Sequence, residues 1–394
     1  MRVFVIAGEM SGDKHGALLI RELQRSEPGV EVAGLGGALM HEAAHGVENW
    51  AEEAAVIGVV EVAKKYGWFR RRFLEILRRL ETERPEVLVL IDYPGFNLRM
   101  AEKVRAAVPE TKIAYFISPQ VWAWHRGRIP KMARVLDLMM CIFPFEKPLF
   151  EEAGLPAVFV GHPLVDDILA SRRSEVREEN LIGLFPGSRL REIERHFPVF
   201  LRTVEILRHR HPEWRFEVAA SHKKLESHMS GMADDAGLPP ETLSIRLGNY
   251  HDLMDRASAG LVASGTATLE ASLHDMPYAL VYKVAWGTFL LAKLLVKIPY
   301  IGMVNILAGR EVVRELVQHE FSEKTAVAEL ERLMLPESRK EVLEGMRAAV
   351  AKLGGGGAAA LAAQSVLALV RGAPLPADCT AGNTVCEASG KPVS

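Results

Sequence analysis

The chain has 394 residues, 49% of them hydrophobic, and its 48 basic residues nearly balance 50 acidic ones. This length is typical of two domains, and the balanced charge argues against a surface that binds nucleic acid, so we expect no nucleic-acid partner. Three cysteines without a CxxC pair exclude a disulfide scaffold and favour a reducing compartment, and we expect neither a metal site nor a cofactor. We also expect no membrane span, because no run of about 18 uncharged apolar residues exists, and no signal peptide, because the first apolar run meets Glu9 too early.

The first predicted strand, Val3–Ala7, ends in a polar loop that reads GEMSGD over residues 8–13, before a predicted helix at 15–25. Open α/β sheets bind ligands at the carboxyl ends of their strands, so this loop is a candidate site. The candidate contacts are Glu9, Ser11, Gly12 and Asp13. The alternative is that Ser11 or Asp13 only caps the following helix.

A second polar loop, DYPGFN (92–97), follows the predicted strand Val87–Ile91 and should lie at the same edge of the sheet. Asp92 comes directly after the strand, where partial burial would raise its pKa and make it a better proton acceptor near neutral pH. Asn97, at the end of the loop, is a further candidate contact. The alternative for Asp92 is a turn residue that hydrogen-bonds its own backbone.

A third loop follows the predicted strand Ile113–Ile117 and reads SPQVWAW (118–124). Two tryptophans close to several basic residues favour a ligand wall or a clamp around a phosphate. Trp122 is the candidate contact here. A role as a core filler is the alternative.

A basic amphipathic stretch lies between the first two loops. The run WFRRRFLEILRRL (68–80) has an apolar face at helical spacing and arginines on the rest of its surface, a pattern typical of helices on membranes or anionic lipids. Together with an apolar run at 56–62, it makes Val60, Val62, Trp68, Phe69, Phe73 and Leu77 candidate membrane contacts. Periodicity alone favours the alternative, a helix whose apolar face packs on the core.

The second half begins after a polar linker at about 162–180. A predicted strand, Leu181–Phe185, is followed by Pro186, Gly187, Ser188 and Arg189, where a glycine lets the backbone approach an anion and an arginine can pair with it. The loop is not a Walker motif, because no Gly-Lys-Ser/Thr follows.

The clearest anion site is predicted at 260–273. A short apolar strand, Gly260–Ala263, turns through Ser264, Gly265 and Thr266 into a helix, so unpaired N–H groups and the positive end of the helix dipole meet there. Glu270, one turn into the helix, can accept hydrogen bonds from a ribose. An ordinary strand-to-helix turn with a serine or threonine cap is the alternative.

These observations predict an α/β protein with two Rossmann-like, doubly wound domains that face each other across a cleft. We place the domains at 1–165 and 175–352, expect the helix 358–371 to return to the first domain, and read 373–394 as a disordered tail. Anion-binding features in the second half and acids in the first suit a nucleotide-sugar donor and an acceptor hydroxyl, respectively.

Eight short motifs carry a resemblance to a known family. They are GEMSGD (8–13), DYPGFN (92–97), SPQVWAW (118–124), FPFEK (143–147), VGHPL (160–164), FPGSR (185–189), ASGTATLE (263–270) and NILAGRE (305–311). In this order, over about residues 1–370, they resemble the lipid-A-disaccharide synthase family. The resemblance implies a GT-B inverting glycosyltransferase at the cytoplasmic face of the inner membrane.

The resemblance further implies transfer of 2,3-diacylglucosamine from UDP-2,3-diacylglucosamine to 2,3-diacylglucosamine 1-phosphate, with a β-1,6 linkage and release of UDP. It makes Asp92 the expected general base, with Glu9 beside the acceptor. The implied donor contacts are Gly187, Ser188, Arg189, Ser264, Gly265, Thr266, Ala267, Thr268, Glu270, Asn305, Arg310 and Glu311. Substrates with acyl chains also shift the basic helix towards membrane contact, and a homodimer is compatible with this family.

Two alternatives stay open at this point. One is another GT-B enzyme of UDP-sugars, either the transferase that forms lipid II or a UDP-N-acetylglucosamine epimerase. The other is a non-enzymatic nucleotide- or lipid-binding module, against which the presence of Glu9, Asp92 and Arg189 argues.

Overall fold

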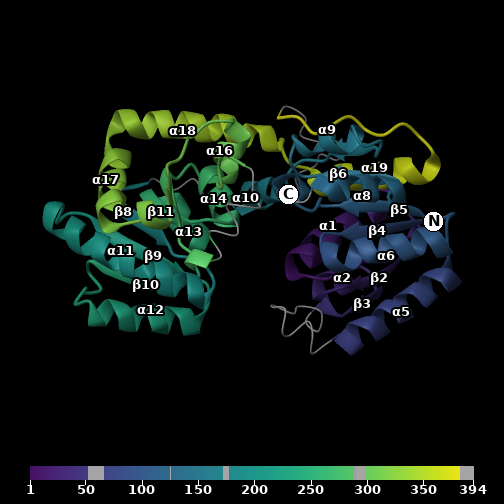
Figure 1. The fold of residues 1–394 in the computed structure, drawn as a ribbon, viewed down its shortest axis with the longest axis horizontal. Coiled ribbons are helices and arrows are strands. Elements are labelled where there is room, and N and C mark those ends of the chain that lie inside the picture. Colours follow the sequence, from purple (N-terminus) through teal and green to yellow (C-terminus); the bar gives the residue numbers. More distant parts are fainter. Residues whose placement is uncertain (52–65, 125, 172–176, 288, 290–297, 382–394) are drawn as a thin grey trace, which may run out of the picture. The chain divides into compact units, whose positions relative to one another are not determined.

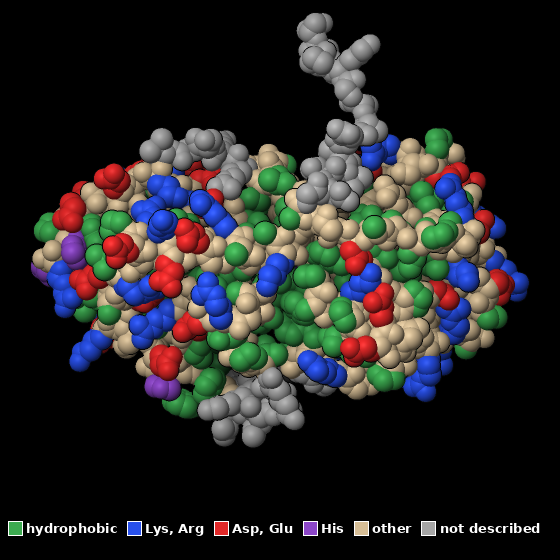
Figure 2. Space-filling view, turned by 90° about the horizontal axis from the view of Figure 1, so that it is seen from above, with side chains coloured by type: hydrophobic (Ala, Val, Ile, Leu, Met, Phe, Trp, Pro, Cys, Tyr) green, Lys and Arg blue, Asp and Glu red, His purple; other side chains and the backbone are tan. Residues whose placement is uncertain are grey.

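The computed structural model describes residues 1–51, 66–124, 126–171, 177–287, 289 and 298–381. The chain divides into two compact units, the first formed by Met1–Asp166 with the residues from Leu353 onward, and the second by Asp167–Lys352. Both units alternate strands with helices along the chain (Figure 1). On the face drawn in Figure 2, basic and acidic side chains of the described residues are interspersed, as the balanced composition suggests.

The first unit is built on a parallel sheet with the order β3-β2-β1-β4-β5-β6-β7. Its strands are β1 Arg2–Ala7, β2 Glu31–Gly36, β3 Gly46–Asn49, β4 Val87–Ile91, β5 Lys112–Phe116, β6 Leu138–Cys141 and β7 Ala157–Phe159. The order reverses between β1 and β4, and Ala7 lies beside Ile91 at that point. In doubly wound sheets this switch point opens the crevice where ligands bind.

Helices cover both faces of this sheet, because its apolar strands are buried on both sides. They are α1 Met10–Ser26, α2 Ala38–Ala43, α5 Tyr66–Glu83, α6 Pro94–Ala107, α7 Val121–Trp124, α8 Ile129–Val135, α9 Glu146–Glu151, α10 Pro163–Ser171 and α19 Ala358–Arg371. One core cluster joins α1 and α19 to the sheet, and another joins α5, α6 and α8 to its other face. Helix α10 crosses the boundary between the units.

The second unit repeats the design with six parallel strands in the order β10-β9-β8-β11-β12-β13. Its strands are β8 Glu178–Phe185, β9 Arg215–Ala220, β10 Leu243–Leu247, β11 Ala257–Ala263, β12 Tyr278–Tyr282 and β13 Glu315–Val317. Its helices are α11 Leu190–Arg210, α12 Lys223–Asp235, α13 Tyr250–Arg256, α14 Thr266–Leu273, α16 Met303–Ala308, α17 Glu323–Met334 and α18 Pro336–Val350. The switch point lies between β8 and β11, and the prediction of two doubly wound α/β sheets is confirmed.

The segment 373–381 differs from the disordered tail that its polar sequence predicted. Asp378 accepts a hydrogen bond from Phe159 N–H at 3.0 Å and pairs with Lys147 Nζ at 2.7 Å. Cys379 N–H donates to the Phe159 carbonyl at 2.8 Å, and the Cys379 side chain is buried. Specific contacts with the edge strand β7, which leave no periodic signal in the sequence, hold the segment on the first unit.

One stretch of the described residues, Pro336–Arg371, contains an 18-residue window that is long and apolar enough to cross a membrane by length and composition, and half of that window is buried. It is not a continuous helix. Helix α18 ends at Val350, and glycines with positive φ at 354, 356 and 357 separate it from α19. The stretch is therefore two helices, one from each unit, joined by a glycine-rich turn.

Helix α5 turns its predicted membrane-contacting side chains towards its own core. Trp68, Phe69, Phe73 and Leu77 are half-buried against the apolar cluster, where Phe73 packs on Phe96 with ring centroids 5.4 Å apart. The exposed face carries Arg70, Arg71, Leu74 and Arg78. Val60 and Val62 lie outside the described residues, and membrane contact of this helix stays a prediction.

Candidate functional site

The two predicted acids of the first unit meet at its switch point. Glu9 follows β1 and Asp92 follows β4, and these strands are hydrogen-bonded neighbours whose carboxyl ends are level. Burial raises the pKa of Asp92 to about 6, and the negative charge of Glu9 contributes to the shift. Asp92 is thus a carboxylate that still ionises at neutral pH but has gained basicity.

The backbone around Asp92 is held in an uncommon conformation. Asp92 and Tyr93 both have positive φ, 45° and 50°, which side chains rarely adopt and which often marks functional sites. The Asp92 carbonyl accepts hydrogen bonds from the Tyr115 hydroxyl at 2.5 Å and from Asn97 Nδ2 at 2.8 Å. These bonds leave the carboxylate as the part of Asp92 that can serve a substrate.

Asn97 is fully buried and braces the switch point. Its Nδ2 also lies 3.2 Å from the Ile91 carbonyl and 3.4 Å from the Ile6 carbonyl, so it ties together the ends of β4 and β1. Its Oδ1 accepts no hydrogen bond within the described part of the chain. Substrate contact by Asn97 stays a prediction, and it would use this oxygen.

The remaining residues of the first loop play different parts. The Asp13 carboxylate accepts hydrogen bonds from the N–H groups of Gly37 at 2.7 Å, Leu39 at 3.1 Å and Met40 at 2.9 Å. It therefore caps α2, rather than the helix on which it lies. Gly12 is buried and Ser11 is exposed. Acceptor contact by these three residues stays a prediction.

A buried carboxylate that sequence reasoning missed lies at the ends of β5 and β6. Glu146 accepts hydrogen bonds from Ser118 Oγ at 2.5 Å and from Phe143 N–H at 3.2 Å. Burial raises its pKa to about 7. Trp122, the predicted acceptor contact, is buried and packs on Phe145 with ring centroids 5.1 Å apart. The signal was available, because the motif FPFEK places two phenylalanines before a glutamate at the start of the helix that follows a buried strand.

In the second unit, the backbone of the loop after β8 is hydrogen-bonded to a nearby acid, Glu192. Glu192 accepts hydrogen bonds from the N–H groups of Ser188 at 3.2 Å and Arg189 at 3.4 Å. Gly187 has a φ of 111°, and a Cβ there would lie 2.4 Å from Glu192 Oε2. Arg189 pairs with Glu192 at 3.0 Å but keeps 76% of its side chain exposed. Of this loop, the Arg189 guanidinium is the group best placed to reach a ligand.

The loop after β11 forms the predicted helix start. Gly265 has a φ of 146°, and α14 begins at Thr266, with Thr268 Oγ1 donating to the Gly265 carbonyl at 2.8 Å. The first N–H groups of a helix lack intrahelical partners, so Gly265 to Ala267 can present donors to an anion. Ser264 is half-buried and ties the loop to β12 through a bond from its N–H to the Val281 carbonyl.

Two residues of α13, Tyr250 and His251, complete this end of the second unit, and His251 was not singled out from the sequence. His251 Nε2 lies 3.7 Å from Glu270 Oε1, and the interaction with this carboxylate raises the pKa of His251. Tyr250 packs on Phe185 with ring centroids 5.1 Å apart. Burial raises the pKa of Tyr250, and the charges of Glu270 and Glu192 raise it further. Tyr250 is thus close to both predicted donor loops.

The motif NILAGRE (305–311) lies away from the loop after β11. Asn305 is buried and fully hydrogen-bonded to Val312, Val313 and Glu315. Arg310 and Glu311 precede β13, whereas Ser264 follows the parallel strand β11, so they lie towards opposite edges of the sheet. The structure does not bring Arg310 and Glu311 to the loop after β11. Their donor contact, like that of Asn305, stays a prediction.

One sequence pattern of the first unit resembles a zinc-binding motif. Residues 41–45 read HEAAH, which matches the HExxH pattern of zinc enzymes. That chemistry needs both histidines on one helix, but α2 ends at Ala43, before His45. His41 Nδ1 lies 2.6 Å from the Val47 carbonyl. Within the described residues, no cluster of three histidine, cysteine or acidic side chains is arranged to hold a metal.

Comparison with known proteins decides the family. A family model described as lipid-A-disaccharide synthetase matches residues 3–366. The chain belongs to the lipid-A-disaccharide synthase family. The lipid-A-disaccharide synthases of Trichlorobacter lovleyi and Geobacter metallireducens are 38% and 37% identical to it over 380 residues, which cover 94% of this chain and 97% of each relative. The protein is accordingly a hexosyltransferase of lipid A biosynthesis.

Solved structures confirm the GT-B fold expected of a lipid-A-disaccharide synthase. A structure titled putative UDP-N-acetylglucosamine 2-epimerase from Listeria monocytogenes has a TM-score of 0.66 at 11% identity and covers 96% of this chain and 99% of its own. MurG of Acinetobacter baumannii has a TM-score of 0.51 at 13% identity, with 88% and 94% covered. These likenesses show the fold alone, whereas the family match excludes the alternative of a non-enzymatic module.

Proposed function

We propose that this synthase transfers 2,3-diacylglucosamine from UDP-2,3-diacylglucosamine to the 6-hydroxyl of 2,3-diacylglucosamine 1-phosphate. The products are the β-1,6-linked disaccharide 1-phosphate and UDP. The observation that carries the proposal is Asp92, a basic carboxylate at the switch point of the first unit, in a chain of this family. The acceptor hydroxyl would bind there.

In the proposed reaction the Asp92 carboxylate accepts the proton of the 6-hydroxyl while that oxygen attacks the anomeric carbon. A positioned general base is worth about 10²–10⁴-fold in rate. The attack displaces UDP from the opposite face and inverts the anomeric centre in one step. No second carboxylate nucleophile is required.

The second unit would bind the donor. The N–H groups at the start of α14 and the exposed Arg189 guanidinium would stabilise the charge that develops on the departing diphosphate. Glu270 would accept hydrogen bonds from the ribose, and His251, paired with it, would fix its orientation. Two structures of the same fold are titled as an MnaA–UDP co-structure and as a UDP-GlcNAc 2-epimerase bound to UDP-GlcNAc, which supports a nucleotide-sugar as the ligand of this fold.

Both proposed substrates carry acyl chains, so the enzyme would work as a peripheral protein on the cytoplasmic face of the inner membrane. The exposed arginines of α5 would face the anionic lipid headgroups there. A homodimer stays a prediction.

The test measures UDP release from UDP-2,3-diacylglucosamine in micelles of an uncharged detergent, with and without the acceptor. We expect release that depends on the acceptor and yields a disaccharide, and we expect EDTA to leave it unchanged. Release without the acceptor, or none with it, would contradict the proposal.

The conservative variant Asp92→Asn tests the role of the base. We expect kcat to fall by about 10²–10⁴-fold, because asparagine keeps the shape of aspartate but accepts no proton. The wild-type rate should also fall as the pH drops below about 6, where Asp92 is protonated. An unchanged kcat in Asp92→Asn would rule out this residue as the base.

A further inference from the structure

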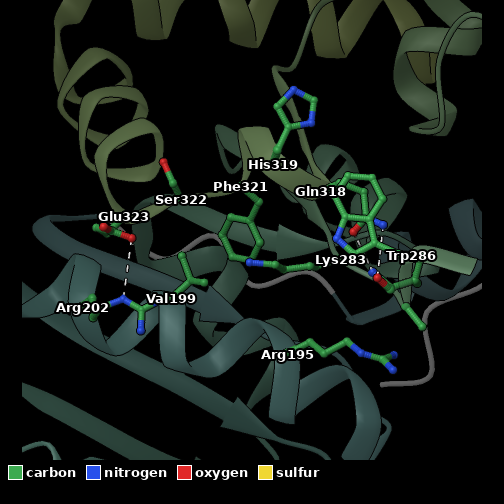
Figure 3. A pocket seen from close by; sticks show the side chains of 12 residues that line it. Arg195, Val199, Arg202, Lys283, Trp286, Gln318, His319, Phe321, Ser322 and Glu323 are labelled. Atoms are coloured by element: carbon green, nitrogen blue, oxygen red, sulfur yellow. Dashed lines mark hydrogen bonds and ion pairs between the residues drawn. The ribbon is translucent and has the colours of Figure 1, made fainter. Parts of the chain in front are cut away.

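A pocket of about 440 Å³ lies at the carboxyl ends of β12 and β13 in the second unit (Figure 3). None of its residues belongs to the predicted donor contacts. Lys283 and Val284 follow β12, Gln318 and His319 follow β13, and Arg195 and Arg202 reach it from α11. Val199, Ala285, Trp286, Phe321, Ser322 and Glu323 complete its lining.

The floor of the pocket is fixed by two buried side chains. The Gln318 amide exchanges two hydrogen bonds with the backbone of Val284, at 3.0 and 3.1 Å. His196 Nε2 accepts the Lys283 N–H at 3.0 Å, so its Nδ1 carries the proton and donates to the Pro186 carbonyl at 2.8 Å. His196 therefore ties the pocket to the loop after β8. The floor adds no charge of its own, because burial lowers the pKa of His196.

The charges of the lining do not balance. The lining has three cationic side chains, Arg195, Arg202 and Lys283, and one carboxylate, Glu323. Glu323 is paired with Arg202 at 3.6 Å. Within the described residues, the side chains of Arg195 and Lys283 have neither an ion pair nor a hydrogen bond. Arg195 is exposed and Lys283 is half-buried. The pocket thus offers two uncompensated cations to an anion.

An apolar wall stands beside these cations. Val199 and Phe321 are buried in the wall, while the Trp286 side chain is 69% exposed (Figure 3). An exposed tryptophan beside basic side chains is typical of surfaces that meet both the headgroup and the apolar part of a lipid. A soluble anion without an apolar part would contact the cations of the lining but leave its apolar wall unused.

We propose that this pocket binds the phosphate of an anionic lipid. Arg195 and Lys283 contact the phosphate, and Trp286 contacts the apolar part of the same molecule. The proposal rests on the proposed function for its lipid context. The phosphate can come from a bilayer phospholipid or from the acceptor substrate, and the two arms of the experiment separate these sources.

The test variant is Arg195→Gln/Lys283→Gln. Its control, Lys224→Gln/Lys340→Gln, removes the same two charges from exposed positions of α12 and α18, outside the pocket. Melting temperatures of both variants establish that they fold. A third variant, Arg195→Lys/Lys283→Arg, keeps the charges and should keep the binding.

In the first arm, co-sedimentation is measured with phosphatidylcholine vesicles, with and without phosphatidylglycerol. If the bilayer supplies the phosphate, binding to the anionic vesicles weakens by about fivefold for each cation removed, the factor for about 1 kcal/mol, and the control binds as the wild type does. In the second arm, KM is measured in uncharged micelles. If the acceptor supplies the phosphate, KM for 2,3-diacylglucosamine 1-phosphate rises about tenfold or more, while KM for the donor is unchanged.

A change in either arm that the control does not share supports the proposal. It is overturned if neither arm changes, if the control changes equally, or if KM for the donor alone rises. A wild type that forms no disaccharide would contradict the proposed function, yet the vesicle arm would still test the pocket.

Discussion

Individual side chains in this protein take their roles from neighbours that are distant in the sequence. Asp92 is basic because it is buried and because Glu9, on another strand, adds a like charge. Asp13, by contrast, is occupied by three N–H groups of the turn into α2. Two acids of similar appearance in the sequence thus have different chemistry, as burial and hydrogen bonding determine.

The coupling of Glu9 to Asp92 can be tested with Glu9→Gln. Removing the like charge lowers the pKa of Asp92, so the acidic limb of the pH profile of kcat/KM should move to lower pH. The displacement should be smaller than the whole shift of Asp92, because burial is the larger cause. Glu110→Gln, an exposed acid before β5, serves as the control. A limb that stays in place would show that Glu9 does not act on Asp92.

Glu146 should make stability depend on pH. Its pKa is raised from 4.5 to about 7, so the folded chain holds a proton that the unfolded chain releases between these values. The free energy of unfolding should therefore fall by about 3 kcal/mol as the pH rises through this window. In Glu146→Gln this contribution is absent. The melting temperature of the variant should therefore rise relative to that of the wild type as the pH is raised. Exposed Glu152→Gln is the control, and a parallel pH dependence of Glu146→Gln and wild type would contradict the prediction.

At the scale of elements, helix α5 shows why an amphipathic pattern is compatible both with packing on the protein core and with contact with a membrane. Its aromatic face packs on the core of the first unit, and its exposed face is basic. Periodicity reports that one face is apolar, but it does not say whether protein or lipid covers that face. Any membrane contact by the described part of the helix would therefore depend chiefly on its arginines and Leu74.

The variant Arg70→Gln/Arg71→Gln/Arg78→Gln tests this surface. Binding to vesicles that contain phosphatidylglycerol should weaken by about fivefold for each arginine removed, with little change in melting temperature, because these side chains are exposed. The corresponding lysine variant should retain binding. Phe73→Ala should instead lower the free energy of unfolding by about 2 kcal/mol, since the ring is half-buried. Undiminished vesicle binding by the glutamine variant would exclude α5 as an electrostatic contact.

At the scale of the whole molecule, the chain passes between its two units twice, after Asp166 and before Leu353. The two passages are joined, because His162 N–H donates to the Leu353 carbonyl at 2.9 Å. Cys379 packs between them. A Cβ on Gly161 would lie 3.0 Å from its Sγ, and a Cβ on Gly354 would lie 2.4 Å from it. The segment 373–381 thus reinforces the place where the chain enters and leaves the first unit.

Gly354→Ala should therefore lower the free energy of unfolding by about 2 kcal/mol, because Gly354 has a φ of 92° and no room for a methyl group. Adding Cys379→Ala should recover part of this loss, so the two substitutions should not be additive. Gly372→Ala, with a φ of 62° and open space, provides a control for the backbone strain alone. Additive losses would contradict a direct contact between residues 354 and 379. Denaturant unfolding measures Gly354→Ala, Cys379→Ala, the combination of the two, and Gly372→Ala.

The candidate site was predictable in part, and particular residues show where prediction ended. Glu9 and Asp92 were found because polar loops after buried strands share an edge of a parallel sheet. Glu146 and His251 were missed, because their significance depends on burial by remote segments and on a partner in another loop. The donor contact of Asn305 stays a prediction, and the structure adds that its amide is hydrogen-bonded to the backbone of residues 312 and 313.

By itself, the sequence determined the alternation of strands and helices, the two doubly wound sheets and, through its motifs, the family. Short stretches of sequence indicate these features, because apolar runs and turn residues mark strands, helices and turns among neighbours along the chain. Only the tertiary structure decided which polar groups are used up internally, that Asp378 and Cys379 hold the last described segment, and that Lys283 and Arg195 share a pocket. The physical reason is that burial and hydrogen bonding between distant residues follow from the order of strands in the sheet, which leaves no periodic trace in the sequence.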